Sequence, residues 1–267
     1  MMAIWALLFL VSCSSDESDV PQGEFIYRKK GEYHFKAERS ALVERESYPW
    51  EEDDKNSKFA KITKEYFRCK GSSLNPRKLE IRNSDAISYA DCGGADKHSL
   101  PLINGKESVY AIQIDLLNWV QNQTHKRVVI TSGHRCPEHN AYVDSSASNQ
   151  LSKHLIGAEV SFYVQGLEDK PEQIIKLMQD YYLQDPFAQN DKKYTVFKRY
   201  EKNDTGVSIQ PWMNHEVYLK IFKKHEGRDF DNRHPYPYIS LQVRTNRTTG
   251  ERVIYTWDKA YNNYLRY

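Results

Sequence analysis

Residues 130–140 read ITSGHRCPEHN, and residues 152–162 read SKHLIGAEVSF. Both stretches join a β-forming run to a polar loop. Residues 127–131 (RVVIT) are rich in β-branched side chains, and residues 159–164 (EVSFYV) alternate between apolar and polar side chains. These patterns are typical of β-strands, and the alternation indicates a strand with one buried face. We therefore predict two strands, each next to a loop that carries histidine.

Helical patterns lie on both sides of these strands. Apolar side chains recur at helical spacing through residues 107–126, at Val109, Ile112, Leu116 and Trp119. Residues 137–143 favour a helical turn. A second long helix is predicted to open at Asp169-Lys170-Pro171, because proline is tolerated in a first helical turn.

Strand patterns dominate the rest of the chain. Residues 24–36 indicate an N-terminal hairpin. Later strands are predicted at 194–200, 215–222, 238–244 and 252–257, and a hairpin loop at 246–250 joins the last two. Helices followed by an antiparallel sheet indicate an α+β fold.

Three segments occur in the order of the motifs of a known family, and the first two match those motifs. Residues 132–135 (SGHR) match its SGYR motif, and residues 152–157 (SKHLIG) match SxHxxG within SxHxxGxAxD. Residues 238–244 (YISLQVR) stand where the family has a strand reading HVDV or HxH. Over residues 107–257 the chain thus resembles the D-alanyl-D-alanine metallocarboxypeptidases, zinc peptidases with the hedgehog/DD-peptidase fold. The resemblance implies helices packed on an antiparallel sheet in residues 107–267, with residues 24–106 as an N-terminal extension packed on that domain.

The resemblance also implies a zinc site. The family holds the ion with the histidine of the second motif, an acid seven residues later and a histidine on the late strand. His154 is the first of these ligands, but the other two positions carry Ser161 and Ser240, and the acidic neighbour is Gln242. A neutral hydroxyl is a poor replacement for a carboxylate or an imidazole on a divalent cation. Arg135 keeps the family's arginine, which orients the site or the substrate carboxylate.

The resemblance implies a domain that binds cell-wall peptide, and these replacements predict that it is catalytically degenerate. We expect no cofactor, and a bound zinc ion is the alternative. Two other functions stay open. An active zinc peptidase that hydrolyses peptidoglycan stem peptides would need a rebuilt site, with His154, Glu159 and His215 as ligands and Glu216 as the general base. The other alternative is an envelope scaffold lipoprotein that binds a protein partner.

The N-terminus is typical of an exported chain. Residues 3–11 (AIWALLFLV) are apolar but too few to span a bilayer. Leu10-Val11-Ser12-Cys13 resembles a bacterial lipobox, which implies removal of a signal peptide at 1–12, lipidation of Cys13 and a tether at 13–23. Such a protein faces the periplasm from a membrane of the cell envelope, and Ser14 after the cysteine favours the outer membrane. The alternative is an apolar core segment with a chance cysteine.

The cysteines favour one disulfide and argue against a structural zinc site. Cys69 and Cys92 flank a loop-rich stretch, so we predict that they pair in an exported protein. Cys136 is then left over, buried or free, although three pairings are formally possible. No CxxC pair and no cluster of cysteine and histidine occurs along the sequence, so a zinc knuckle is not expected.

Charge argues against one class of partner. The 267-residue chain carries 38 Lys and Arg against 36 Asp and Glu, which gives a net charge of +2. A dedicated nucleic-acid-binding protein normally has a strong basic excess. We therefore expect no nucleic-acid partner.

Overall fold

A computed structural model describes residues 59–82 and 85–267. The predicted signal peptide, Cys13, the tether and the hairpin at 24–36 lie outside these residues. The described part is mixed α and β with antiparallel sheets, which confirms the α+β class.

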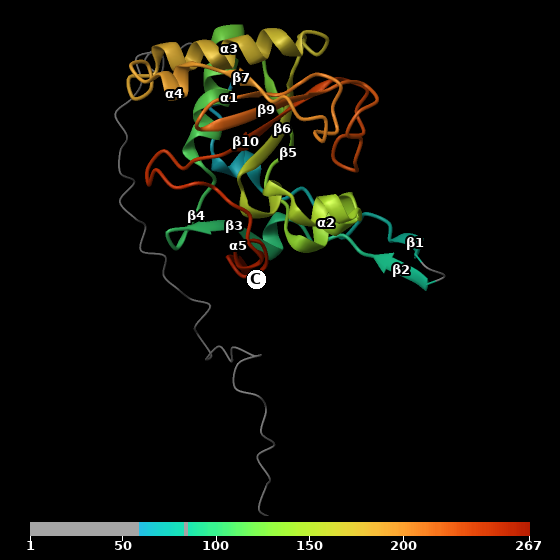
Figure 1. Cartoon of the computed structure of the whole chain (residues 1–267). Helices are drawn as coiled ribbons and strands as arrows, with labels where there is room; N and C mark the ends of the chain where they lie inside the picture. The colour runs from blue at the N-terminus through green and yellow to red at the C-terminus, as the bar shows by residue number, and fades with distance from the viewer. Residues whose placement is uncertain (1–58, 83–84) are drawn as a thin grey trace, which may run out of the picture. The chain divides into compact units, whose positions relative to one another are not determined.

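The centre of the fold is a six-stranded sheet in which every neighbouring pair is antiparallel (Figure 1). In spatial order its strands are β5 (Val128–Ser132), β6 (Glu159–Val164), β10 (Tyr238–Val243), β9 (Val217–Phe222), β8 (Trp212–Met213) and β7 (Lys198–Arg199). The two strands with the clearest alternation in the sequence, β6 and β10, are therefore hydrogen-bonded neighbours.

Alternation along these strands gives the sheet two different faces, because successive strand residues point to opposite sides. One face carries buried apolar side chains such as Val160, Leu219 and Leu241, which belong to the main hydrophobic core. The helices α1 (Ala111–Thr124) and α3 (Pro171–Gln184) contribute further residues to that core and cover this face in Figure 1. Polar side chains alternate with the core residues and point to the opposite face.

A tryptophan joins the two covering helices. The indole nitrogen of Trp119 on α1 donates to the backbone oxygen of Leu177 on α3 at 2.8 Å, and its ring packs edge-on against Tyr181. The α3 helix begins with Pro171 in its first turn, as predicted. The α1 helix is shorter than predicted at its start, because Lys106–Glu107 form β4 and pair with the preceding strand.

Smaller elements surround the sheet. A three-stranded sheet has the order β11 (Tyr264–Arg266), β3 (His98–Ile103) and β4, and a hairpin joins β1 (Lys78–Arg82) to β2 (Asp85–Tyr89). In Figure 1 this hairpin projects away from the sheet. The remaining helices are short: α2 (Pro137–Val143), α4 (Lys192–Thr195) and α5 (Trp257–Tyr261).

The described residues before 107, which begin at residue 59, contribute to the main core. Ile62, Phe67 and Leu100 are buried in the same cluster as the sheet and α1. The Asn118 side chain on α1 exchanges two hydrogen bonds of 2.8 Å with the backbone of Ile62. A side chain at Gly133 would put Cβ 2.5 Å from the Phe67 oxygen, so only glycine permits this close approach.

The strand predicted at 194–200 is confirmed only at Lys198–Arg199, and the strand predicted at 252–257 is wrong. A helix cap explains each difference. Residues 194–200 form the end of α4 and the two-residue β7, because the Asp191 side chain accepts from the Lys193 amide and starts a helix. In 252–257 only Arg252 makes an isolated bridge, and Thr256 then caps α5. The predicted strands at 127–131, 159–164, 215–222 and 238–244 are confirmed with small shifts at their ends.

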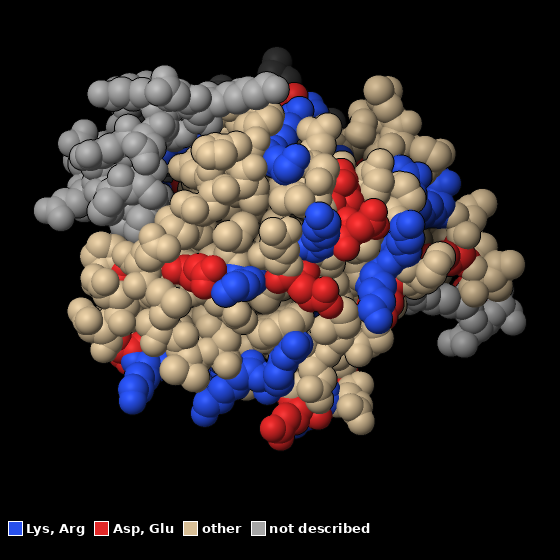
Figure 2. Space-filling model, turned by 90° about the horizontal axis from the view of Figure 1, so that it is seen from above, with Lys and Arg blue, Asp and Glu red and all other residues tan. Residues whose placement is uncertain are grey.

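No helix within the described ranges is long and apolar enough to cross a membrane. On the face seen from above in Figure 2, acidic and basic side chains lie interspersed.

We predict that Phe67→Ala lowers the free energy of unfolding by about 3–5 kcal/mol, the usual cost of removing a buried phenylalanine ring. Phe67 is 0% exposed, whereas its neighbour Tyr66 is 44% exposed. Urea unfolding followed by circular dichroism measures the loss, and Tyr66→Ala is the matched control with little effect. Equal losses in the two variants would contradict the packing of this segment in the core.

Candidate functional site

The three positions that the resemblance assigns to zinc ligands meet on the polar face of the sheet. Ser161 on β6 pairs in register with Ser240 on β10, which pairs in turn with Lys220 on β9. His154 lies in a 3₁₀ turn, Lys153–Ile156, just before β6, and its Nε2 is 3.5 Å from the Ser161 hydroxyl. The three positions named by the resemblance therefore lie close together in the fold.

These residues do not fit a zinc ion. The Nδ1 atom of His154 is 2.6 Å from the Gly133 backbone oxygen, to which it donates, so Nε2 is left as an acceptor facing the Ser161 hydroxyl. Burial lowers the pKa of His154, which keeps the ring neutral. One imidazole and two serine hydroxyls do not form a zinc donor set.

Glu159 does not rebuild the site, because its carboxylate is already occupied. Its Oε1 accepts from the Ser240 hydroxyl at 2.6 Å and from the Gln242 amide at 3.0 Å, and it lies 3.8 Å from His154 Nε2. Burial alone would raise its pKa, but the charge of Lys220 and the two donated hydrogen bonds lower it. Glu159 is thus a buried carboxylate held by its neighbours.

The predicted ligand set of His154, Glu159 and His215 is not assembled among the described residues, whose potential metal-binding groups include none of the three. His215 is exposed and lies in a turn, not on a strand, because the Asn214 side chain accepts from the amides of Glu216 and Val217. The His215 ring packs against Tyr194.

Glu216 was predicted as a general base, but it belongs to a buried ion-pair triad. Arg247 contacts Glu216 Oε2 at 2.7 Å and Asp185 Oδ2 at 2.6 Å, and both carboxylate side chains are 0% exposed. A carboxylate held this way is not free to accept a proton from water. The triad instead ties the loop after β10 to the start of β9 and the end of α3.

Arg135 is also committed to the protein interior. Its guanidinium contacts Asp229 at 2.8 Å and Asp231 at 3.0 Å, and its Nε donates to the Ser132 hydroxyl at 2.7 Å. Only 2% of Arg135 is exposed. It therefore orders the loop around residues 229–232 and has no free face for a substrate carboxylate.

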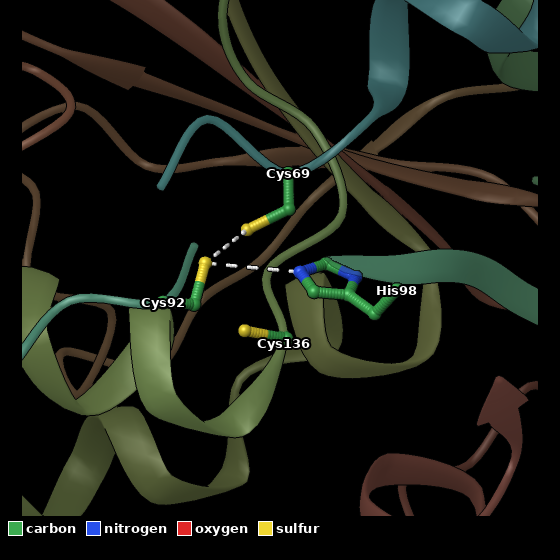
Figure 3. A group of neighbouring side chains, drawn as sticks. All are labelled: Cys69, Cys92, His98 and Cys136. Atoms are coloured by element: carbon green, nitrogen blue, oxygen red, sulfur yellow. Dashed lines mark hydrogen bonds between the residues drawn. The ribbon is translucent and has the colours of Figure 1, made fainter. Parts of the chain in front are cut away.

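A second group of side chains can hold a metal ion, and a metal site there was not predicted from the sequence. The ligand atoms of Cys69, Cys92, His98 and Cys136 all lie within 4.8 Å of one another, and all four residues are buried. Figure 3 shows the four side chains gathered around a common space. They come from different parts of the chain: the coil after η2 (Lys64–Phe67), the loop after β2, the start of β3 and the residue before α2.

Backbone groups complete this cluster. His98 Nδ1 is 3.1 Å from the Ser99 oxygen, while its Nε2 is 3.7 Å from Cys92 Sγ. The Gly94 amide donates to Cys92 Sγ at 3.4 Å. Hydrogen bonds with the Cys136 and Cys69 thiols lower the pKa of Cys92 despite its burial.

The expected disulfide between Cys69 and Cys92 needs correction. Cys69 and Cys92 are neighbours, as predicted, but they are free thiols with their Sγ atoms 3.7 Å apart. Cys136 is buried next to them, and His98 was not singled out at all. No local spacing signal could reveal the cluster, because its members are spread from position 69 to 136 and meet only in the folded chain.

The described residues thus hold a polar site on the sheet face around His154, Ser161 and Ser240, and a Cys₃His cluster beside the β5–α2 loop. No family model matches the chain, and neither a curated protein nor a solved structure gives a match.

We predict that Arg247→Ala lowers the free energy of unfolding by about 3–5 kcal/mol, because two buried carboxylates lose their partner. Lys176 on α3, whose side chain is 75% exposed and pairs with Asp180, provides a control. Lys176→Ala should change stability by less than about 0.5 kcal/mol. Urea unfolding at neutral pH measures both, and a small effect of Arg247→Ala would show that the triad is structurally dispensable.

Proposed function

We propose that this chain is a lipid-anchored envelope protein whose D-alanyl-D-alanine carboxypeptidase-like domain binds cell-wall peptide without cutting it. One observation carries the proposal. The positions of His154, Ser161 and Ser240 converge as zinc ligands do in that family, yet they carry only one metal-binding side chain. This combination supports a peptidase-like arrangement that lacks the ligands for a catalytic metal.

The topology supports a hedgehog/DD-peptidase-like fold. The strand that follows the second motif, β6, lies beside the late strand β10, so both motifs end on one face of one sheet. The first motif reaches the same place, since Ser132 on β5 pairs with Ser161. This arrangement is the one expected if all three motifs once served a common site.

A depression beside this site supports ligand binding. It has a volume of about 350 Å³, and Gln242 lines it while also donating to Glu159. Its charged lining residues are Lys153, Lys220 and Arg244, opposed by Asp204. An excess of positive charge suits a peptide that ends in a free carboxylate, as cell-wall stem peptides do.

The proposal of a lipid anchor at Cys13 is supported by the sequence alone. The apolar run at 3–11 and the lipobox-like residues before Cys13 support export and lipidation of that cysteine. Envelope placement would bring the domain to the layer in which stem peptides occur.

Isothermal titration calorimetry tests binding: the full chain is titrated with a stem peptide that ends in D-Ala-D-Ala, and the affinity is measured. We expect Lys220→Ala to weaken binding about tenfold to hundredfold, because a hydrogen bond to a charged group contributes about 1.5–3 kcal/mol. Lys176→Ala, on the helix-covered side, should leave the affinity unchanged. Amidating the peptide's C-terminal carboxylate should weaken binding as much as Lys220→Ala does.

Two results would contradict this function. Chelator-sensitive release of D-alanine would show that the domain is a working zinc peptidase. Absence of binding to stem peptides and to intact sacculi, together with capture of a discrete protein partner, would favour the scaffold alternative.

The anchor is tested separately by metabolic labelling with a palmitate analogue in a bacterial host. We predict that Cys13→Ser abolishes the label and releases the protein from the membrane fraction, while Ser15→Ala retains both. Persistent labelling of Cys13→Ser would place the lipid elsewhere or show that the apolar segment is not a lipoprotein signal.

A further inference from the structure

We infer that Cys69, Cys92, His98 and Cys136 bind one structural zinc ion. This site is separate from the degenerate site at His154 and does not depend on the proposed binding function.

The spacing of the ligand atoms fits tetrahedral zinc. Zn–S bonds of about 2.3 Å and Zn–N bonds of about 2.0–2.1 Å at tetrahedral angles put two sulfurs about 3.8 Å apart, and a sulfur and a nitrogen about 3.6 Å apart. In the structure Cys69 Sγ and Cys92 Sγ are 3.7 Å apart, and Cys92 Sγ and His98 Nε2 are also 3.7 Å apart. These two distances match a bound zinc ion, and the remaining ligand atoms lie within 4.8 Å of one another.

The donor set selects both the metal and its role. Three thiols and one imidazole make a Cys₃His set, one of the usual combinations for structural zinc. All four ligands come from the protein, and each is less than 9% exposed, so no open position is left for water or substrate. A closed site of this kind stabilises the fold and performs no catalysis.

The surroundings prepare the ligands for coordination. His98 Nδ1 donates to the Ser99 oxygen, which leaves the lone pair of Nε2 facing the sulfurs. Amide donors at 3.4 Å reach two of the sulfurs, from Gly94 to Cys92 and from His139 to Cys136. These hydrogen bonds stabilise the negative charge of thiolates, whose protons leave to solvent when the metal binds.

Close backbone packing also fits a site built around these sulfurs. A side chain at Gly71 would place its Cβ 2.1 Å from Cys92 Sγ, so this position must remain glycine for Cys92 to reach the cluster. A single disulfide would use two of the thiols and leave the third, together with His98, buried without a role. Zinc uses all four groups.

The ion would join parts of the chain that are distant in sequence. Cys69 follows the segment containing Phe67, Cys92 and His98 flank the entry to β3, and Cys136 directly precedes α2. Zinc would thereby fasten the residues before 107 to the loop between β5 and α2, which contributes Gly133 and Arg135 to the sheet-face site.

The test uses the full chain with Cys13→Ser, so that the three cluster cysteines are the only thiols. Elemental analysis should find about one zinc ion per chain, and Cys136→Ser or His98→Ala should lose most of it. His154→Ala is the matched control and should retain the metal; its loss there would instead place the ion at the degenerate site and overturn this assignment.

A second measurement avoids dependence on variants that fail to fold. Replacing the metal with Co²⁺ in the Cys13→Ser protein should give the intense visible bands of a tetrahedral ion and a sulfur-to-cobalt charge-transfer band. A protein that takes up neither metal overturns the proposal. So does a denatured mass lower by two hydrogen atoms, because a disulfide would then occupy the site.

Discussion

The antiparallel pairing of β6 with β10 is the constraint on which the rest of the structure depends. In this register Ser161 lies opposite Ser240 and Glu159 lies opposite Gln242, so polar residues meet polar residues across the strands. The intervening residues form the apolar face that α1 and α3 cover. A shift by one residue would move every core side chain to the opposite face, so core packing itself fixes the composition of the polar site.

The sequence predicted this part of the fold well because the signals are local. Two-residue alternation identified β6, helical spacing identified α1, and a proline suited to a first helical turn identified the start of α3. Local signals failed where a short cap competed with a strand pattern, as at Asp191 and Thr256. A side-chain oxygen that satisfies helix amides outweighed the β-forming residues that follow.

The sites were likewise predictable only where local sequence signals mark them. The motif resemblance placed His154, Ser161 and Ser240 together, since their spacing relative to two strands is a local property. The resemblance did not predict that Arg135 and Glu216 form buried ion pairs. Their partners, Asp229 and Asp231 for Arg135 and Arg247 for Glu216, are distant in sequence. The Cys₃His cluster was invisible for the same reason. Its members come from four places along the chain, and only tertiary packing brings them together.

The short loop from Ser132 to Cys136 connects the two sites physically. The Gly133 oxygen accepts from His154, and the Arg135 amide donates to the His154 backbone oxygen at 3.2 Å. The same loop contacts Phe67, whose oxygen accepts from the His134 amide at 2.7 Å, and ends at Cys136 in the cluster. A metal bound at Cys136 would therefore hold one end of the loop whose other end shapes the polar sheet face. A binding site gains affinity when its residues are ordered before the ligand arrives, because less conformational entropy is lost on binding. If the domain binds peptide as proposed, a structural metal in the cluster would keep the loop beside the polar sheet face in place.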